Sequence, residues 1–267
     1  MVSIILACYN CEDLVSKAID SVVGQSYDDW ELLIVDDGST DGSLEILRRY
    51  GANDPRIKVY TQQNQGVSKA RNLALSHASG EFLCFLDADD WLPENSLQAR
   101  INKFQESPAI SFVDGQVDVY DETGKTIQRT WKPAFRGNPH RQLVRLSSSC
   151  FLGLTWMIRR KPGQVYQFDE SVKHGEDLLL FERLSRGGGV YDFVDQPVYC
   201  YRNRAGSAMK DADGLGEGYR ALRKIFTASH AFSTTDRLIF EYKIRRIMFL
   251  TYIRSGNIAK ALRYLIR

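Results

Sequence analysis

The chain has 267 residues, of which 43% are hydrophobic and 25% are charged. This composition excludes a disordered or fibrous chain, and the length allows one large α/β domain, alone or with a helical appendage. The formal net charge of +2 gives no overall field that would attract nucleic acid, so we expect no nucleic-acid partner.

In the first 108 residues, strand patterns alternate with helix patterns. The predicted strands are short apolar runs that end in polar residues or turns: Val2–Ala7, Glu31–Val35, Arg56–Tyr60 and Glu81–Leu86. The predicted helices follow them in turn: Glu12–Val23, a helix with Asp41 as its N-cap, Val67–His77 and Pro93–Gln105. This order predicts an α/β fold with a Rossmann-like, mostly parallel central sheet and helices on both faces.

After residue 108 the pattern changes. Ile110–Tyr120 and Thr126–Trp131 flank a turn sequence and predict a hairpin. The other elements predicted before residue 210 are three strands and a helix: Phe151–Ile158, Val190–Val194 and Val198–Tyr201, and Glu176–Leu184. From about Gly214 onward the pattern is helical, which predicts a C-terminal helical segment.

Cysteine usage and the N-terminus indicate the compartment. The five cysteines are odd in number and scattered, which argues against a disulfide framework and favours a reducing environment. The apolar run Val2–Ala7 is too short for a signal peptide, and no stretch approaches the ~20 apolar residues of a membrane span. We therefore expect a cytoplasmic protein, with peripheral attachment to the inner face of the cell membrane as the alternative.

Polar residues at predicted strand ends are the first functional signal. Ligands gather at the C-terminal ends of parallel strands, and one such end carries Asp87-Ala88-Asp89-Asp90. Three carboxylates in four positions repel one another unless a cation or strong hydrogen bonds compensate. Mg²⁺ and Mn²⁺ prefer oxygen ligands and bridge carboxylates to substrate phosphates. A solvated turn that caps the next helix is the alternative for this segment.

A second strand end, at Asp36-Asp37-Gly38, should lie beside the end of the first strand. There Tyr9 is placed to stack on a flat base, and a carboxylate to accept hydrogen bonds from base N–H groups. An ordinary turn is the alternative, because Asp and Gly are common turn residues. The nearby pair Cys8 and Cys11 suggests a redox or zinc motif, but the acid clusters have no redox use, so we interpret both thiols as core-filling.

Two further segments carry charged residues at predicted helix starts. Asn64–Asn72 opens a helix whose N-terminus favours an anion, and Lys69 and Arg71 add cationic donors. A phosphate site and a solvated basic helix face both fit this segment. Glu176 and Asp177 either favour the helix N-terminus through its dipole or supply a general base for an acceptor hydroxyl.

Taken in order, these segments resemble the family 2 glycosyltransferases, which have the GT-A fold. The resemblance rests on five pieces: Val2–Asn10, Glu31–Gly42, Asn64–Asn72, Gly80–Pro93 and Phe168–Asp177. Tyr201-Arg202 with Ser207 resembles a further family segment, so the resemblance runs from residue 2 to about 207. The region from about residue 210 onward shows no match.

The resemblance implies roles for matching residues. The donor base, usually uracil, would be held by the backbone of Ala7, the ring of Tyr9 and Asp37. Asp87 would contact the ribose. Asp89 would bind Mn²⁺ or Mg²⁺ on the diphosphate, and Lys69 and Arg71 would lie near the nucleotide. Asp177 would be the general base, with Glu176 beside it. We take Asp90, Trp156 and Arg202 as further candidates for contacts to the donor or acceptor sugar.

The resulting expectation is a metal-dependent, inverting glycosyltransferase with a GT-A catalytic domain over residues 1–210. Residues 1–108 would form its nucleotide-binding half, residues 109–210 its acceptor-side half, and residues 211–267 a helical extension. The donor would be a nucleotide-sugar, most simply a UDP-sugar, and the acceptor a glycan or lipid-linked glycan. A nucleotidyltransferase acting on a sugar phosphate and an inactive nucleotide- or glycan-binding domain are the alternatives.

The C-terminal segment is basic. Asp236 to Arg267 contains eight Lys or Arg and two Asp or Glu, a balance of 8 − 2 = +6. Apolar residues interleave with these charges, and a basic amphipathic helix can lie on an anionic membrane surface. Peripheral membrane contact would suit a polyprenyl-linked acceptor. Packing of the helix on the catalytic core, with a solvated basic face, is the alternative.

Overall fold

The computed structural model describes residues 1–204, 206, 210–228 and 232–266, so Ser207 lies outside the described residues. Its N-terminal part is a parallel sheet in the order β3-β2-β1-β4. These strands are β1 (Val2–Cys8), β2 (Trp30–Asp36), β3 (Ile57–Thr61) and β4 (Phe82–Phe85). All four predicted strands are present, with bounds that differ by at most one residue at each end.

The sheet continues with strands of both directions. The added strands are β5 (Ile110–Tyr120), β6 (Ile127–Trp131), β7 (Met157–Arg159) and β8 (Val190–Arg202). β7 pairs antiparallel with β4 and β5, β6 pairs antiparallel with β5, and β8 runs parallel to β5. The predicted α/β fold is therefore confirmed, with a mixed eight-stranded sheet whose N-terminal strands are parallel.

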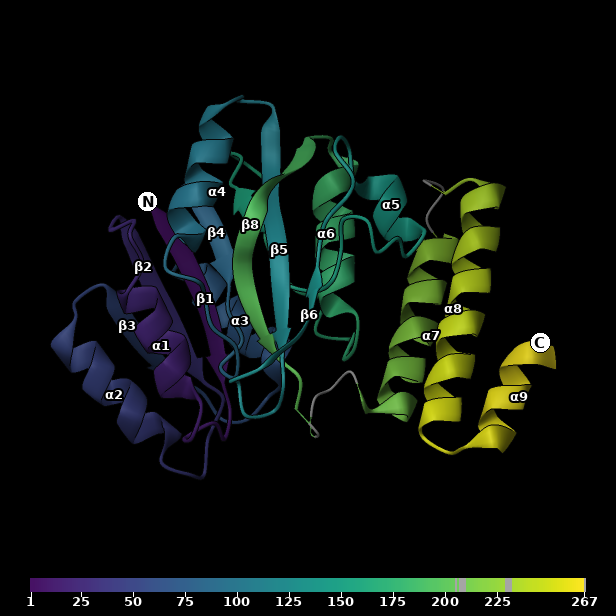
Figure 1. Ribbon diagram of the computed structural model, residues 1–267, viewed down its shortest axis with the longest axis horizontal. Coiled ribbons are helices and arrows are strands. Elements are labelled where there is room, and N and C mark those ends of the chain that lie inside the picture. The colour runs from purple at the N-terminus through teal and green to yellow at the C-terminus, as the bar shows by residue number, and fades with distance from the viewer. Residues whose placement is uncertain (205, 207–209, 229–231, 267) are drawn as a thin grey trace.

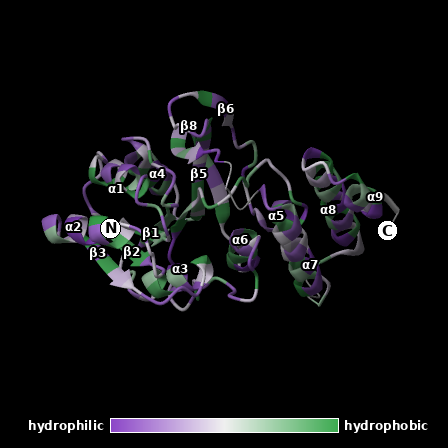
Figure 2. Ribbon diagram, turned by 90° about the horizontal axis from the view of Figure 1, so that it is seen from below, coloured by the Kyte–Doolittle hydropathy of each residue, from purple (hydrophilic) through white to green (hydrophobic). Residues whose placement is uncertain are grey.

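Helices cover both faces of this sheet (Figures 1 and 2). One face carries α1 (Val15–Val23), α2 (Ser43–Asn53) and α4 (Ser96–Gln105). The other carries α3 (Val67–Ser76) and α6 (Glu176–Arg186). β1 is buried on both sides because Ile4 and Leu6 face the first layer while Ile5 faces the second. This is why the strand reads as a continuous apolar run.

Four more helices extend the second layer beyond α6 (Figure 1). They are α5 (His140–Val144), α7 (Ala212–Ala228), α8 (Thr234–Arg254) and α9 (Ile258–Ile266). On α8, buried side chains recur at every fourth position, with Phe240, Ile244, Met248 and Tyr252 joined to the core under α6. Within the described ranges, no helix has the length and apolar character needed to cross a lipid bilayer.

Local contacts explain where the predicted boundaries were wrong. α1 begins at Val15 because the Glu12 carboxylate accepts a hydrogen bond from the N–H of Gly42, at 2.6 Å, and so lies outside the helix. Asp41 is not the N-cap of α2, although its carboxylate accepts from the N–H of Ser43 at 3.0 Å. The strands predicted at Val190–Val194 and Val198–Tyr201 are one strand, β8, whose pairing register shifts near Pro197.

Candidate active site

A cavity of about 470 Å³ lies at the C-terminal ends of β1 and β4 and reaches the N-terminus of α6. The strand ends concerned point toward the lower edge of the molecule in Figure 1. The predicted site residues that line this cavity come from both halves of the chain: Ala7, Tyr9, Arg71, Asp87, Asp89, Asp90, Glu176 and Asp177. The fold thus brings carboxylates from separate segments to one hollow.

Asp90 fixes the acid loop to β8. Its side chain is buried, and its two carboxylate oxygens accept from the backbone N–H of Arg202 at 2.7 Å and from the Tyr199 hydroxyl at 2.9 Å. Burial, reinforced by the negative charges of Asp89 and Asp87, raises the pKa of Asp90 well above its ordinary value. Asp90 lines the cavity wall, yet its oxygens are already engaged by the protein.

Asp89 and Asp87 present their carboxylates to the cavity. Asp89 accepts from the Arg204 guanidinium at 3.1 Å. Burial and the neighbouring Asp87 charge raise the pKa of Asp89, while Arg204 opposes that rise. Asp87 accepts from Arg71 at 2.7 Å, and its side chain is 41% exposed. Sequence reasoning missed Arg204, whose one signal is its place two residues beyond the end of β8.

Arg71 joins the two acid segments across the cavity. Its side chain is 7% exposed, and its two terminal nitrogens donate to Asp87 at 2.7 Å and to Glu176 at 2.9 Å. Burial alone would lower the pKa of Arg71, but the surrounding carboxylates outweigh burial and raise it. The guanidinium lies 5.2 Å from the centre of the Phe168 ring, a cation–π distance.

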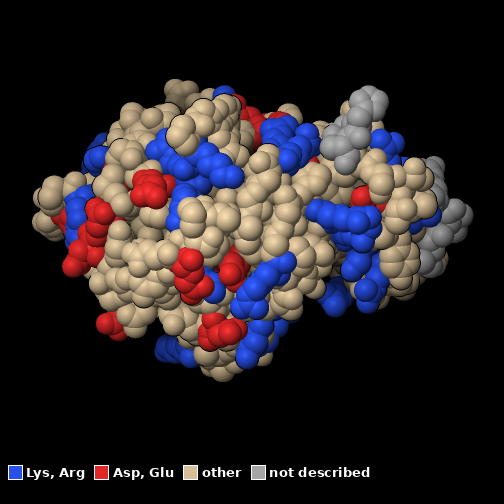
Figure 3. Space-filling model, turned by 90° about the horizontal axis from the view of Figure 1, so that it is seen from above, with Lys and Arg blue, Asp and Glu red and all other residues tan. Residues whose placement is uncertain are grey.

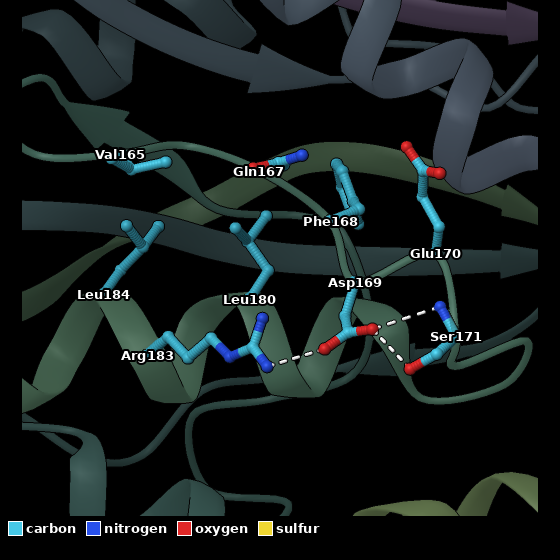
Figure 4. A pocket seen from close by; sticks show the side chains of 9 residues that line it. All are labelled: Val165, Gln167, Phe168, Asp169, Glu170, Ser171, Leu180, Arg183 and Leu184. Atoms are coloured by element: carbon cyan, nitrogen blue, oxygen red, sulfur yellow. Dashed lines mark hydrogen bonds and ion pairs between the residues drawn. The ribbon is translucent and has the colours of Figure 1, made fainter.

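The loop around Phe168 is fixed from both sides. Asn72, one residue after Arg71, accepts from the N–H of Phe168 at 2.7 Å and donates to its carbonyl at 3.0 Å. Figure 4 shows the same loop beside α6, where Asp169 accepts from Arg183 and Ser171. The open surface cavity of about 570 Å³ in that view contains none of the catalytic candidates. We interpret this cavity as the outer face of the loop that places Phe168 beside Arg71.

Asp177 and Glu176 open α6 but have different partners. Glu176 is held by Arg71, whereas Asp177 accepts a hydrogen bond from the N–H of Leu178 at 2.7 Å. Burial, together with the adjacent Glu176 charge, raises the pKa of Asp177 to about 7. Gly175 precedes them with φ of +82°, and a Cβ there would lie 2.8 Å from a methyl carbon of Leu222 on α7. Glycine therefore permits both the left-handed turn and the close approach of α7.

Asp37 does not line this cavity. Its carboxylate is buried at the end of β2 and accepts from the side chain of Gln62 at 2.7 Å and from the N–H groups of Gln65 and Gly66 at 2.9 and 2.8 Å. The sequence predicted an anion at the N-terminus of α3. In the structure, the N–H groups of Gln65 and Gly66 donate to the Asp37 carboxylate, which is therefore an anion at this position. A negative side chain suits a helix N-terminus for the same dipole reason.

Three other predicted residues lie away from the cavity. Trp156 as a sugar contact is wrong, because its side chain is 0% exposed and stacks on Phe181 at 4.4 Å in the core. Arg202 as a sugar contact is also wrong, because its buried guanidinium donates to the carbonyl of Asp89 at 3.0 Å and so supports the acid loop from behind. Lys69 bonds the side chain of Gln65 at 2.8 Å and is absent from the cavity lining.

The cavity also has walls that the sequence patterns did not indicate. The segment Leu152–Thr155, predicted as part of a strand, is loop and lines the cavity beside Asp177. β7 starts only at Met157. Leu215 on α7, Tyr199 on β8 and His174 before α6 also line the cavity. Of the two thiols interpreted as core-filling, Cys8 is buried, whereas Cys11 lines the cavity.

Comparison with known proteins identifies the fold. The sequence model for glycosyl transferase family 2 matches residues 3–165. The chain belongs to this family. It is a glycosyltransferase, and the family match sets aside the nucleotidyltransferase alternative. Glycosyltransferase GlyA of Streptococcus pneumoniae is 37% identical over 221 residues, which are 77% of this chain and 31% of that protein. The share of a curated relative that the chain covers varies widely, for example 26% and 70% in two others.

Solved structures share the GT-A-like fold. TarS of Staphylococcus aureus, residues 1–349 in complex with UDP-GlcNAc, gives a TM-score of 0.72 at 21% identity over 92% of this chain and 72% of that one. The mannosyltransferase PcManGT of Pyrobaculum calidifontis, in complex with GDP-Man and Mn²⁺, gives a TM-score of 0.67 at 18% identity over 99% of this chain and 73% of that one. The predicted GT-A-like architecture is confirmed.

Proposed function

We propose that this protein transfers a sugar with inversion from a nucleotide-diphosphate donor, a UDP-sugar, to a hydroxyl of a glycan or lipid-linked glycan. One observation carries the proposal: Asp87 and Asp89 line the same cavity as Asp177, from different elements. Asp87 is suited to the ribose of a nucleotide donor, Asp89 to its diphosphate through a divalent cation, and Asp177 to an acceptor. The complexes of TarS with UDP-GlcNAc and of PcManGT with GDP-Man support a nucleotide-sugar donor.

The donor base would lie against β1. Tyr9 is 48% exposed, so one face of its ring is available for stacking, and Ala7 lines the adjoining wall. Asp37 already accepts three hydrogen bonds. Asp37 is also buried and outside the cavity lining, so a base N–H would reach its remaining lone pair only if the loop at Gln65 and Gly66 moved. Asp87, partly exposed beside Arg71, is suited to the ribose hydroxyls.

The residues present fit a divalent cation at Asp89. Among the residues described, no group of three His, Cys, Asp or Glu side chains is placed to hold a metal. Mg²⁺ is commonly bound by one or two carboxylates together with substrate phosphates and water. Asp89 would therefore hold Mg²⁺ or Mn²⁺, with the donor diphosphate supplying the other oxygens. A cation there would neutralise charge on the departing diphosphate.

Asp177 is suited to be the base and Glu176 is not. The Glu176 carboxylate is paired with Arg71 at 2.9 Å, so taking a proton would break a buried ion pair. Asp177, with a pKa of about 7, is poised to take a proton near neutral pH. As the acceptor oxygen bonds to the anomeric carbon, its proton passes to Asp177. The bond to the diphosphate breaks on the opposite face of the sugar, which inverts the configuration.

We further propose that the C-terminal helices contact an anionic membrane on the cytoplasmic side. Leu238, Tyr242 and Ile253 on α8 and Ile258 and Leu262 on α9 are exposed. Figure 3 shows Lys and Arg gathered over the right-hand part of the molecule, where Figure 1 places these helices. Together these features give an apolar and basic surface suited to a bilayer interface. Residues 1–210 would then be the catalytic domain and 211–267 its membrane-facing extension.

Vesicle sedimentation tests the membrane contact. The protein should pellet with phosphatidylglycerol vesicles at low salt and much less with phosphatidylcholine vesicles. Leu238→Glu should reduce pelleting, whereas Val165→Glu should not, because Val165 is an equally exposed apolar residue far from these helices. No sedimentation at low salt, or equal loss in both variants, would retire the membrane proposal without touching the catalytic one.

A donor screen tests the function itself. Purified protein is incubated with UDP-, GDP- and dTDP-sugars, with and without Mn²⁺, and nucleoside diphosphate release is measured. UDP release that depends on Mn²⁺ and on an added glycan acceptor is the expected result. No release from any nucleotide-sugar would favour a domain that only binds nucleotide or glycan.

A further inference from the structure

A second cavity, of about 430 Å³, lies between α7, α8 and α9, outside the residues that the family sequence model matches. We call it the C-terminal groove. Its charged and aromatic lining residues are Asp213, Tyr219, Arg220, Arg223, Glu241, Arg245, Tyr252, Lys260, Arg263 and Tyr264. Five of these are cationic and two are anionic, a balance of 5 − 2 = +3 within one small volume.

The two acids of the groove are already paired. Glu241 binds Arg223 at 2.6 Å, and Asp213 binds Lys260 at 2.7 Å. Arg245 and Arg263 make no ion pair with any residue that the structure describes. Arg220 lies 3.8 Å from Glu217, outside the groove lining. Two of the five cations, Arg245 and Arg263, therefore line the groove without a counter-ion, which is the arrangement that recruits an anion.

Gly216 on α7 keeps the floor of the groove open. A Cβ at this position would lie 3.2 Å from the terminal methyl of Met248 and 3.4 and 3.5 Å from the hydroxyls of Tyr264 and Tyr252. Because glycine carries no side chain, these two hydroxyls stand close together above the α7 backbone. The Tyr252 hydroxyl donates to Asp213 at 2.8 Å. The groove thus combines guanidinium groups with the Tyr264 hydroxyl, and guanidinium groups bind phosphate oxygens well.

The groove reaches the catalytic cavity across one turn of α7. Gly216 lines the groove, while its neighbour Leu215 lines the cavity that contains Asp177. Tyr219, one turn further, lines the groove. Tyr219 is also close enough to Asp177 for that negative charge, added to burial, to raise the pKa of Tyr219 to about 12. A helix with its side chains is ~10 Å across, so an acceptor at Asp177 that bound in the groove would have to extend at least that far around α7.

We propose that the C-terminal groove is an anion subsite that binds a phosphate group of the acceptor while the acceptor hydroxyl reaches Asp177. This inference rests on the proposed function, since it assumes an acceptor at Asp177. A phosphate could come from an isoprenyl phosphate carrier or from a phosphorylated glycan. Both present the same dianionic group to Arg245 and Arg263.

Binding to protein saturated with UDP and Mg²⁺ tests the subsite, because the donor site is then filled. Geranyl phosphate and glucose 6-phosphate are titrated by calorimetry, with geraniol and glucose as neutral matches. At least one phosphate should bind, and which one binds more tightly identifies its source. The R245Q/R263Q double variant should weaken that binding about tenfold, a typical loss for two partly exposed charge-assisted contacts. K243Q/R246Q removes the same charge from α8 outside the groove and should change it less than twofold.

Several outcomes would overturn the subsite. One is that geraniol or glucose binds as tightly as its phosphate. Another is that neither phosphate shows saturable binding. A third is that the two double variants lose phosphate affinity equally. In the same preparation, UDP binding with Mg²⁺ should be unchanged by R245Q/R263Q. If wild-type protein failed to bind UDP at all, the proposed function would fail, and that result is separate from any result at the groove.

Transfer assays test the connection to Asp177. With the donor found in the screen, an octyl glycoside that carries a phosphate should be used more efficiently than the same glycoside without it. In R245Q/R263Q this preference should fall about tenfold through a higher KM, with kcat unchanged. Equal use of both glycosides by the wild-type protein would contradict a phosphate subsite in the acceptor path.

Discussion

Replacing Asp177 with Asn should make the protein inactive and more stable at the same time. Asp177 is placed against Glu176 and out of bulk water, and both effects oppose its negative charge. Its pKa rises from an ordinary 3.8 to about 7. At ~1.4 kcal/mol per unit, the full shift corresponds to about 4 kcal/mol of unfolding free energy. Water in the cavity screens part of the repulsion on the Asp177 charge. We therefore expect Asp177→Asn to raise the free energy of unfolding by about 2 kcal/mol at pH 8.

The sign of this effect fixes its pH dependence. The folded-state pKa lies above the unfolded value, so the folded protein holds the extra proton between about pH 4 and 7. The wild-type protein therefore loses stability as pH rises through this window. The Asn side chain has no proton to lose there, so the variant keeps its stability. The difference between the two proteins should be close to zero near pH 4 and reach its full value above pH 7.

Urea unfolding of both proteins at pH 5, 6.5 and 8 measures this difference. The other acidic groups titrate in both proteins and cancel in the comparison. The transfer rate should fall by at least ~100-fold in the same variant, which is the usual effect of removing a general base. A stability difference that is the same at pH 5 and pH 8, or a variant less stable than wild type at pH 8, would refute the reasoning about the Asp177 charge.

Three further predictions concern the same cavity. Asp89→Ala should abolish transfer and weaken Mn²⁺-dependent UDP binding in calorimetry. Asp177→Asn should leave that binding nearly intact. Equal losses of UDP binding in the two variants would contradict metal binding by Asp89 and proton removal by Asp177 as separate roles. Initial rates of UDP release should rise about tenfold per pH unit below pH 7 and level off above it, as Asp177 loses its proton; a flat profile from pH 5.5 to 8 would contradict this. Arg71→Met should cost about 3–5 kcal/mol of unfolding free energy, because two carboxylates lose their buried partner. Exposed Lys69→Met should change it by less than ~0.5 kcal/mol.

The parallel part of the fold was predictable because its signals are local. β1, β2 and β4 are short apolar runs, and strands buried on both faces produce such runs. β3 lies at the edge of the sheet, and only Ile57 of its residues is buried. The later elements depended on contacts between distant segments. The predicted strand at Phe151–Ile158 has ordinary β-forming residues, but only Met157–Arg159 finds partners, in β4 and β5. Leu152–Thr155 of that segment become cavity wall instead.

The candidate site was partly predictable for a similar reason. Motif residues at strand ends and helix starts, such as Asp89 and Asp177, reach the cavity because their elements are placed by the fold. Side-chain direction was not readable from the sequence. Trp156 has the chemistry for a sugar platform, yet burying its large ring in the core against Phe181 removes more apolar surface from water. Arg202 likewise serves the acid loop from behind.

The pairing of Arg71 explains why adjacent acids can have different tasks. Glu176 and Asp177 follow one another on α6, and either would have the chemistry of a base. Arg71 reaches across from α3 and binds only Glu176 of the two, while its second nitrogen binds Asp87 on the donor side. Burial, together with the adjacent Glu176 charge, raises the pKa of Asp177, which has no hydrogen bond from Arg71. One buried cation thus ties the donor-side carboxylate to the helix that carries the base. A change at Arg71 should therefore shift the pH dependence of transfer as well as stability.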